Sequence, residues 1–113
     1  MYQLDRFVAL IRPREPFLDW LRSVPDFEDL DLTLEHVRGD STALLIPQFD
    51  DEDEAVAFVY RIWDDIFNGE LDAWTEEKAL WPQGRTIEMF MEWFDVEIHT
   101  TVAEIEESDT RTH

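Results

Sequence analysis

The stretch TIEMFMEWFDVEIHTTV, residues 86–102, changes its hydrophobic period halfway along. Thr86 is a favoured residue for the N-cap of a helix. The first half then spaces its apolar residues by three and four, which places on one helical face Ile87, Phe90, Met91 and Phe94. From Asp95 onward apolar and polar residues alternate, as in a strand with one solvated face. The stretch therefore predicts a short capped helix that leads directly into a strand.

Two apolar segments upstream predict further strands. Residues 6–13 (RFVALIRP) and 41–47 (STALLIP) are short, largely apolar and closed by proline, which suits buried strands better than helices. Between them, Pro16 occupies a plausible first position of a helix. An acidic segment over 26–40 follows, in which Thr33 is placed to cap one short helical turn.

Residues 52–67 form the longest predicted helix. The acidic residues at 50–54 stand where the partial positive charge of a helix N-terminus favours carboxylates. An apolar stripe follows at helical spacing, comprising Ala55, Val59, Ile62, Trp63 and Ile66. The step Asn68-Gly69 is typical of a helix end, so we expect the helix to stop there. Ile62 and Phe90 are expected to be core residues.

The order of these elements predicts the fold class. With short turns over 71–80, the order is β-α-β-α-α-β, an α/β (α+β) arrangement in which helices cover a small sheet of about three strands. The length of 113 residues is typical of one domain. We expect a single globular domain over 1–105 and a polar, frayed C-terminal tail over 106–113.

The composition restricts the possible partners. The chain carries 28 acidic and 9 basic residues, a formal net charge of −19, and its only lysine is Lys78. This charge repels nucleic acid and anionic membranes, so neither is an expected partner. A hydrophobic content of 44% is sufficient for a core, which indicates that the charge coats a folded domain. Without a signal-like or membrane-spanning segment, a cytoplasmic location is the simplest interpretation.

The motifs of common enzymes and metal sites are missing from the sequence. There is no cysteine, and no serine lies in a nucleophile elbow. The carboxylates at 50–54 lack the glycine and the alternate ligand positions of a calcium loop. His99 shares a predicted strand face with Glu97, but His36 and His113 show no spacing that would bring them to it. We therefore predict no catalytic residue, no cofactor and no metal site, and lean against an enzyme.

The candidate contact residues are arginines and tryptophans. Arg12 and Arg14 flank the proline that ends the first predicted strand, where they could form a small anion site with Arg85 and His99. The alternative is that these arginines neutralise nearby carboxylates and hold loops. Trp74 and Trp81 lie in an irregular segment, where they either anchor a partner or pack against the core.

Three segments carry a resemblance to a known group of proteins. They are IRPREPFLDWLRSVPD (11–26), LLIPQFDDEDEA (44–55) and EEKALWPQGRTIEMFMEWFDVEIH (76–99). Their landmarks resemble a family of small acidic bacterial proteins that have no assigned function. The resemblance covers most of the chain except its ends, and it implies a bacterial cytoplasmic protein but no catalytic residue.

The leading hypothesis from the sequence is a non-enzymatic acidic interaction protein that engages a basic protein partner. One alternative is an acidic housekeeping domain adapted to high salt. Another is a small anion-binding or ligand-binding domain, or an enzyme, centred on Arg12, Arg14, Glu97 and His99. A further alternative is a nucleic-acid mimic that binds a DNA-binding protein through its spaced carboxylates.

Overall fold

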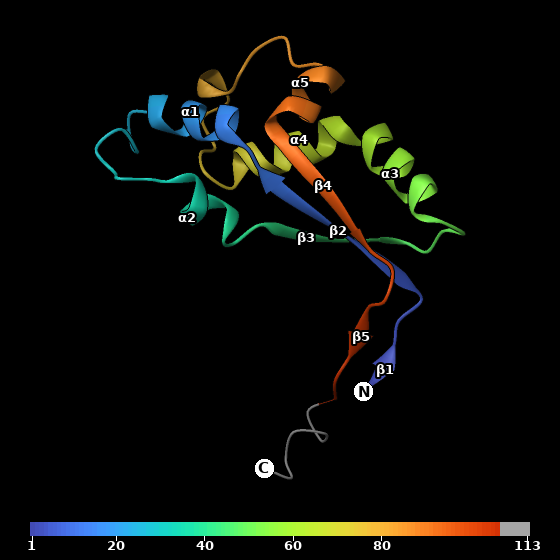
Figure 1. Cartoon of the computed structure of the whole chain (residues 1–113). Helices are drawn as coiled ribbons and strands as arrows, with labels where there is room; N and C mark the ends of the chain where they lie inside the picture. The colour runs from blue at the N-terminus through green and yellow to red at the C-terminus, as the bar shows by residue number, and fades with distance from the viewer. Residues whose placement is uncertain (107–113) are drawn as a thin grey trace, which may run out of the picture.

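A three-stranded antiparallel sheet lies at the centre of the protein (Figure 1). The computed structural model describes residues 1–106. The strands lie in the order β3-β2-β4 and span Thr42–Pro47, Arg6–Pro13 and Phe94–His99. Side chains on β2 alternate between buried and half-buried, because the strand is central and only one of its faces is covered. The two outer strands, β3 and β4, are edge strands, so each has one side that pairs with no other strand of this sheet.

Helices pack on one face of this sheet (Figure 1). They are α1 Glu15–Ser23, α2 Leu34–Arg38, α3 Glu52–Arg61, α4 Trp63–Asp72, the single 3₁₀ turn η1 Lys78–Leu80 and α5 Ile87–Trp93. The covered face of β2 presents Phe7, Ala9 and Ile11, all buried. The fold class predicted from the sequence is confirmed, with helices on one face and an open face opposite.

Aromatic rings fill the space between helices and sheet. The ring of Phe94, at the start of β4, lies 5.2 Å from the ring of Phe17 and 5.3 Å from the rings of Phe67 and Phe90, measured between centroids. These four rings come from α1, α4, α5 and β4, so a single cluster joins most of the fold. Offset and edge-on ring pairs add to the burial of apolar area.

Three predicted helix starts are confirmed in detail. The hydroxyl of Thr33 accepts a hydrogen bond from the amide of His36 at the start of α2. Thr86 does the same for Met89 at the start of α5. The carboxylate of Asp51 accepts from the amide of Glu54 at 2.9 Å, so the acidic run opens α3 as the charge pattern indicated.

The predicted end of the long helix is wrong. The helix breaks at Ile62, where φ is −104° and ψ is 22°, and α4 then continues through Asn68 and Gly69 to Asp72. Phe67 and Leu71 of α4 are fully buried. Packing of these side chains outweighs the weak helix propensity of the Asn-Gly step.

Two residues of the predicted helical stripes are also less buried than expected. Met91 is 40% exposed, because α5 directs Phe90 inward and has only two turns with which to bury a face. Ile62 is half-buried, since it lies at the α3–α4 junction beside a cavity. Phe90 is completely buried, as predicted.

A second, two-stranded sheet projects from the body of the protein (Figure 1). It pairs β1 Tyr2–Gln3 with β5 Ala103–Glu104, and the Tyr2 hydroxyl donates a hydrogen bond to the Glu104 carboxylate at 2.7 Å. The sequence analysis did not predict this ribbon, because two residues per strand are too few to show a period. Of the predicted tail, 107–113 lie outside the described residues. Within residues 1–106 no helix has the length and apolar character needed to cross a bilayer.

Candidate functional site

The open face of the sheet brings together three of the predicted site residues. Arg12 Nη2 lies 2.9 Å from Glu97 Oε2, and His99 Nε2 lies 3.1 Å from the same oxygen. The antiparallel pairing of β2 with β4 causes this, because it places Leu10 opposite Glu97 and so aligns the side chains of one face. The hydrogen bond from Arg12 and then the one from His99 lower the pKa of Glu97 below its usual value.

Arg14 belongs to a neighbouring group rather than to this one. Its Nε lies 3.7 Å from Asp95 Oδ1, and Arg38 Nη1 lies 3.0 Å from Asp95 Oδ2. Arg38 also donates to the carbonyl of Pro13 and so ties α2 to the end of β2. Arg12, Arg14 and Arg38 are therefore all paired with carboxylates of the chain itself. Exposed pairs of this kind contribute little stability, and these three guanidinium groups are already engaged by carboxylates.

Arg85 lies in the helical layer, away from the open face. It donates to the carbonyl of Pro82 at 3.1 Å and to Asn68, and its Nη2 lies 3.5 Å from Asp64 Oδ1. Its guanidinium carbon lies 5.3 Å from the ring centre of Phe67. The geometry is that of an arginine holding the loop before α5 against α4.

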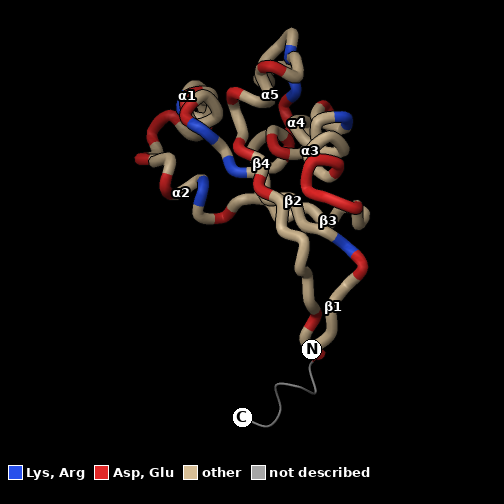
Figure 2. The backbone as a smooth tube through the Cα atoms, turned by 45° about the vertical axis from the view of Figure 1, so that its right-hand side comes forward, with Lys and Arg blue, Asp and Glu red and all other residues tan. Residues whose placement is uncertain are grey.

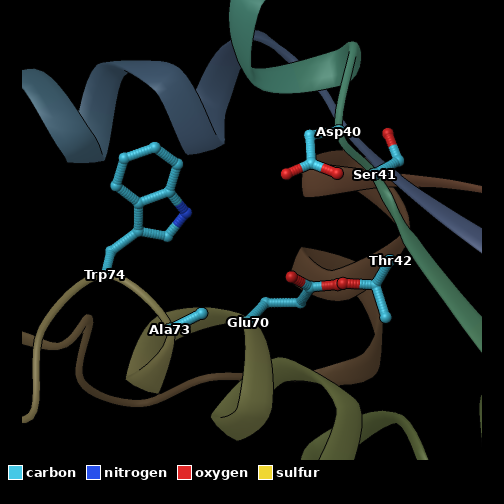
Figure 3. A pocket seen from close by; sticks show the side chains of 6 residues that line it. All are labelled: Asp40, Ser41, Thr42, Glu70, Ala73 and Trp74. Carbon is cyan, nitrogen blue, oxygen red and sulfur yellow. The ribbon is translucent and has the colours of Figure 1, made fainter.

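The two candidate tryptophans differ in exposure. Trp81 is only 8% exposed, and its indole N–H donates to the carbonyl of Thr75 at 2.9 Å, so it packs inside the loop and offers no surface to a partner. Trp74 is half-buried and packs edge-on against Phe27, with a centroid distance of 5.5 Å. One side of Trp74 lines a cavity (Figure 3).

This cavity is one end of a groove between the edge strand β3 and helix α4. Two adjoining cavities, of about 400 and about 320 Å³, share Thr42, Glu70 and Ala73 in their walls. One end of the groove is polar and is lined also by Asp40, Ser41 and Trp74 (Figure 3). The other end is largely apolar and is lined also by Leu44, Ile62, Asp65, Ile66 and Gly69. We call this whole depression the β3–α4 groove.

Glu70 lies at the centre of the β3–α4 groove. Figure 3 shows its side chain extending from α4 toward Thr42 on β3. Burial raises the pKa of the Glu70 carboxyl above its ordinary value, and a hydrogen bond from the Thr42 side chain partly offsets this. Its Oε1 atom is buried and has no hydrogen-bond partner. A half-satisfied buried carboxylate attracts a cationic donor.

Replacing Glu70 by glutamine is expected to stabilise the protein at pH 7 by on the order of 1 kcal/mol, because it removes a partly desolvated charge. The raised pKa means that protonated Glu70 stabilises the fold fully below the ordinary value of 4.5, and that this contribution is lost as the pH rises through the raised pKa. The gain from Glu70→Gln should therefore be small near pH 4 and should grow toward pH 7. Chemical denaturation at several pH values measures this.

The exposed Glu92 on α5 provides a matched control, since Glu92→Gln removes one negative charge without changing a buried group. Its effect on the free energy of unfolding should be smaller at pH 7. A Glu70→Gln variant that is no more stable than Glu92→Gln at pH 7 would contradict the assignment of Glu70 as a desolvated carboxylate.

The sequence analysis missed Glu70 and Thr42 as site residues. A signal was present, because Ile62, Ile66, Glu70 and Ala73 follow one another at helical spacing and so share a face. The expected helix end at Asn68-Gly69 concealed it. The position of Thr42 opposite Glu70 could come only from the tertiary structure.

Comparisons of the chain with protein-family models, with curated proteins and with solved structures find no match. Among residues 1–106, no three histidine, aspartate or glutamate side chains are grouped so that they could hold a metal ion.

Proposed function

We propose that this protein is a non-enzymatic acidic interaction protein that binds a basic protein partner. The observation that carries the proposal is the imbalance between its charges. The chain contains 28 acidic residues. Within residues 1–106, arginines form ion pairs with Asp64, Asp95 and Glu97. Most carboxylates within residues 1–106 thus face solvent without a paired arginine or lysine, which supports attraction of a positively charged surface.

The distribution of the charge supports the same proposal. Acidic segments recur along the helices and loops, whereas basic segments are few and isolated (Figure 2). Several arginines are already used to connect elements of the fold, as Arg38 connects α2 to β2 and β4. A surface of one sign raises the rate of encounter with a partner of the opposite sign and disfavours partners of the same sign.

An acidic housekeeping domain adapted to high salt is the second candidate. The even spread of the acidic segments and the single lysine favour it. Under this hypothesis the charge maintains solubility and engages no particular protein. The two candidates differ in what they predict for association kinetics.

Neutralising Asp50, Glu52 and Asp53 to their amides is expected to slow association with the basic partner by about threefold to tenfold at low salt, because exposed charges steer encounters over long range. The fold should persist, since the capping carboxylates of Asp51 and Glu54 remain. The dependence of the association rate on salt should also become flatter. Capture from the native lysate at several salt concentrations would identify the partner, and stopped-flow mixing would then give the rates.

The salt-adaptation hypothesis predicts the opposite pattern. The same triple variant would then be less soluble, and no protein would be captured at a fixed stoichiometry. Association rates that change with neither the substitutions nor the salt concentration would contradict the proposed function.

A further inference from the structure

We propose that the β3–α4 groove receives an extended segment of the basic partner, which pairs with the free edge of β3 as a fourth strand and inserts an arginine or lysine side chain between Asp40 and Glu70. This inference rests on the proposed function and assigns it a site. The experiments below separate failure of the site from failure of the function.

The composition of β3 is the first argument. It forms one edge of the sheet, so every second residue directs its N–H and C=O groups away from β2. Proteins usually protect such edges with charged residues, and the other edge strand, β4, carries Asp95, Glu97 and His99. β3, with the sequence TALLIP, has no charged residue in a chain that is 33% charged, and its Leu45 is 58% exposed. Strand addition is the recognition mode that uses such an edge.

The shape of the β3–α4 groove is the second argument. A strand of six residues is about 20 Å long, which is sufficient to pair with a short extended segment. Side chains at alternate positions of an added strand would point into the groove, about 7 Å apart. One of them would meet the polar end at Glu70 and the next the apolar end at Leu44 and Ile66. The groove therefore fits a basic residue and an apolar residue separated by one position.

The charge of the groove determines which partner it accepts. Asp40, Asp65 and Glu70 line it, and no arginine or lysine within residues 1–106 forms an ion pair with any of them. A guanidinium inserted there would form an ion pair with the Glu70 carboxylate, which lines the cavity, and lie beside the ring of Trp74. A second copy of this chain fits poorly, because antiparallel β3–β3 pairing would bring the acidic grooves of the two copies together, where their like charges repel.

The probe for a direct test is a heptapeptide of sequence TVTRTVT with an acetylated N-terminus and an amidated C-terminus. Its valine and arginine side chains share one face, and the pattern is the same in both chain directions. We expect saturable binding, and replacement of the arginine by its neutral isostere citrulline should weaken it by about tenfold. Glu70→Gln should weaken binding of the arginine peptide by about tenfold and abolish its preference over the citrulline peptide. Glu92→Gln should change the affinity less than about twofold.

Backbone methylation of the probe tests the strand pairing itself. In an added strand, the N–H groups of alternate residues face β3 and the others face solvent. One of two peptides, methylated either at the valine and arginine amides or at the threonine amides, should therefore lose binding, while the other should retain it. Equal binding of the two methylated peptides would overturn strand addition.

Two results separate failure of the site from failure of the function, and a third excludes misfolding. Equal loss of affinity in Glu70→Gln and Glu92→Gln would overturn the groove as the binding site while leaving general attraction of basic proteins intact. A captured basic protein that binds wild type and Glu70→Gln with the same affinity would also overturn the site alone. Because the uncharged amide is expected to stabilise the free protein, a weakened Glu70→Gln variant that melts no lower than wild type supports the site rather than misfolding.

Discussion

Replacing Phe90 by alanine is expected to lower the free energy of unfolding by about 4 kcal/mol. Phe90 is completely buried, and its ring lies 6.2 Å from the ring of Phe67 and 5.3 Å from that of Phe94. Truncation therefore removes apolar area and leaves a cavity between α4, α5 and β4, which the surrounding rings can fill only by abandoning their own contacts. Urea denaturation followed by tryptophan fluorescence gives the value.

The neighbouring residue supplies the control for this prediction. Met91 belongs to the same helix but is 40% exposed, so Met91→Ala should cost less than about 1 kcal/mol. Phe90→Leu, which keeps most of the volume, should lie between the two variants. Equal losses for Phe90→Ala and Met91→Ala would show that α5 is rotated relative to the arrangement described above.

Replacing Trp81 by alanine is expected to cost about 3 to 5 kcal/mol. The indole is 8% exposed and donates to the carbonyl of Thr75 at 2.9 Å. The guanidinium of Arg85 lies 5.8 Å from the centre of the indole ring, so truncation also removes a cation–π contact. The irregular segment between α4 and α5 contains only the 3₁₀ turn η1, so this side chain is one of the few anchors that fix it.

Trp81→Phe separates packing from hydrogen bonding. It retains most of the buried ring but leaves the carbonyl of Thr75 without this donor, which should cost about 1 to 2 kcal/mol. Trp74→Ala should cost less than Trp81→Ala, because Trp74 is only half-buried. A loss for Trp81→Ala no larger than for Trp74→Ala, measured by chemical denaturation, would contradict the structural role assigned to Trp81.

Local signals were sufficient for most elements of the fold. The change of period at Asp95 marked the passage from α5 to β4, and threonines at 33 and 86 marked two helix starts. These signals act within one or two turns of the chain, where capping and the alternation of side chains depend on adjacent residues alone. They failed at Asn68-Gly69, where burial of Phe67 and Leu71 by residues far away in the sequence keeps the helix intact.

The candidate site was harder to predict from the sequence than the fold was. Glu97 and His99 share one strand face, as expected, and Arg12, which was grouped with them only as an alternative, contacts the same Glu97 Oε2. Arg14 and Arg85, proposed for the same site, pair with other carboxylates. Whether an arginine is available to a ligand depends on which carboxylate lies within about 4 Å of it, and no periodicity encodes that.

The sequence by itself determined that this chain forms a small α+β fold coated with negative charge, because hydrophobic period, capping residues and composition are properties of neighbouring residues and of totals. The tertiary structure alone decided that β3 is an edge strand, that α4 lies beside it, and that Thr42 meets Glu70 across a groove. The physical reason is that these relations depend on strand order and on the packing of helices against one face. Both are set by the sum of many long-range contacts, and no single segment of the chain carries that information.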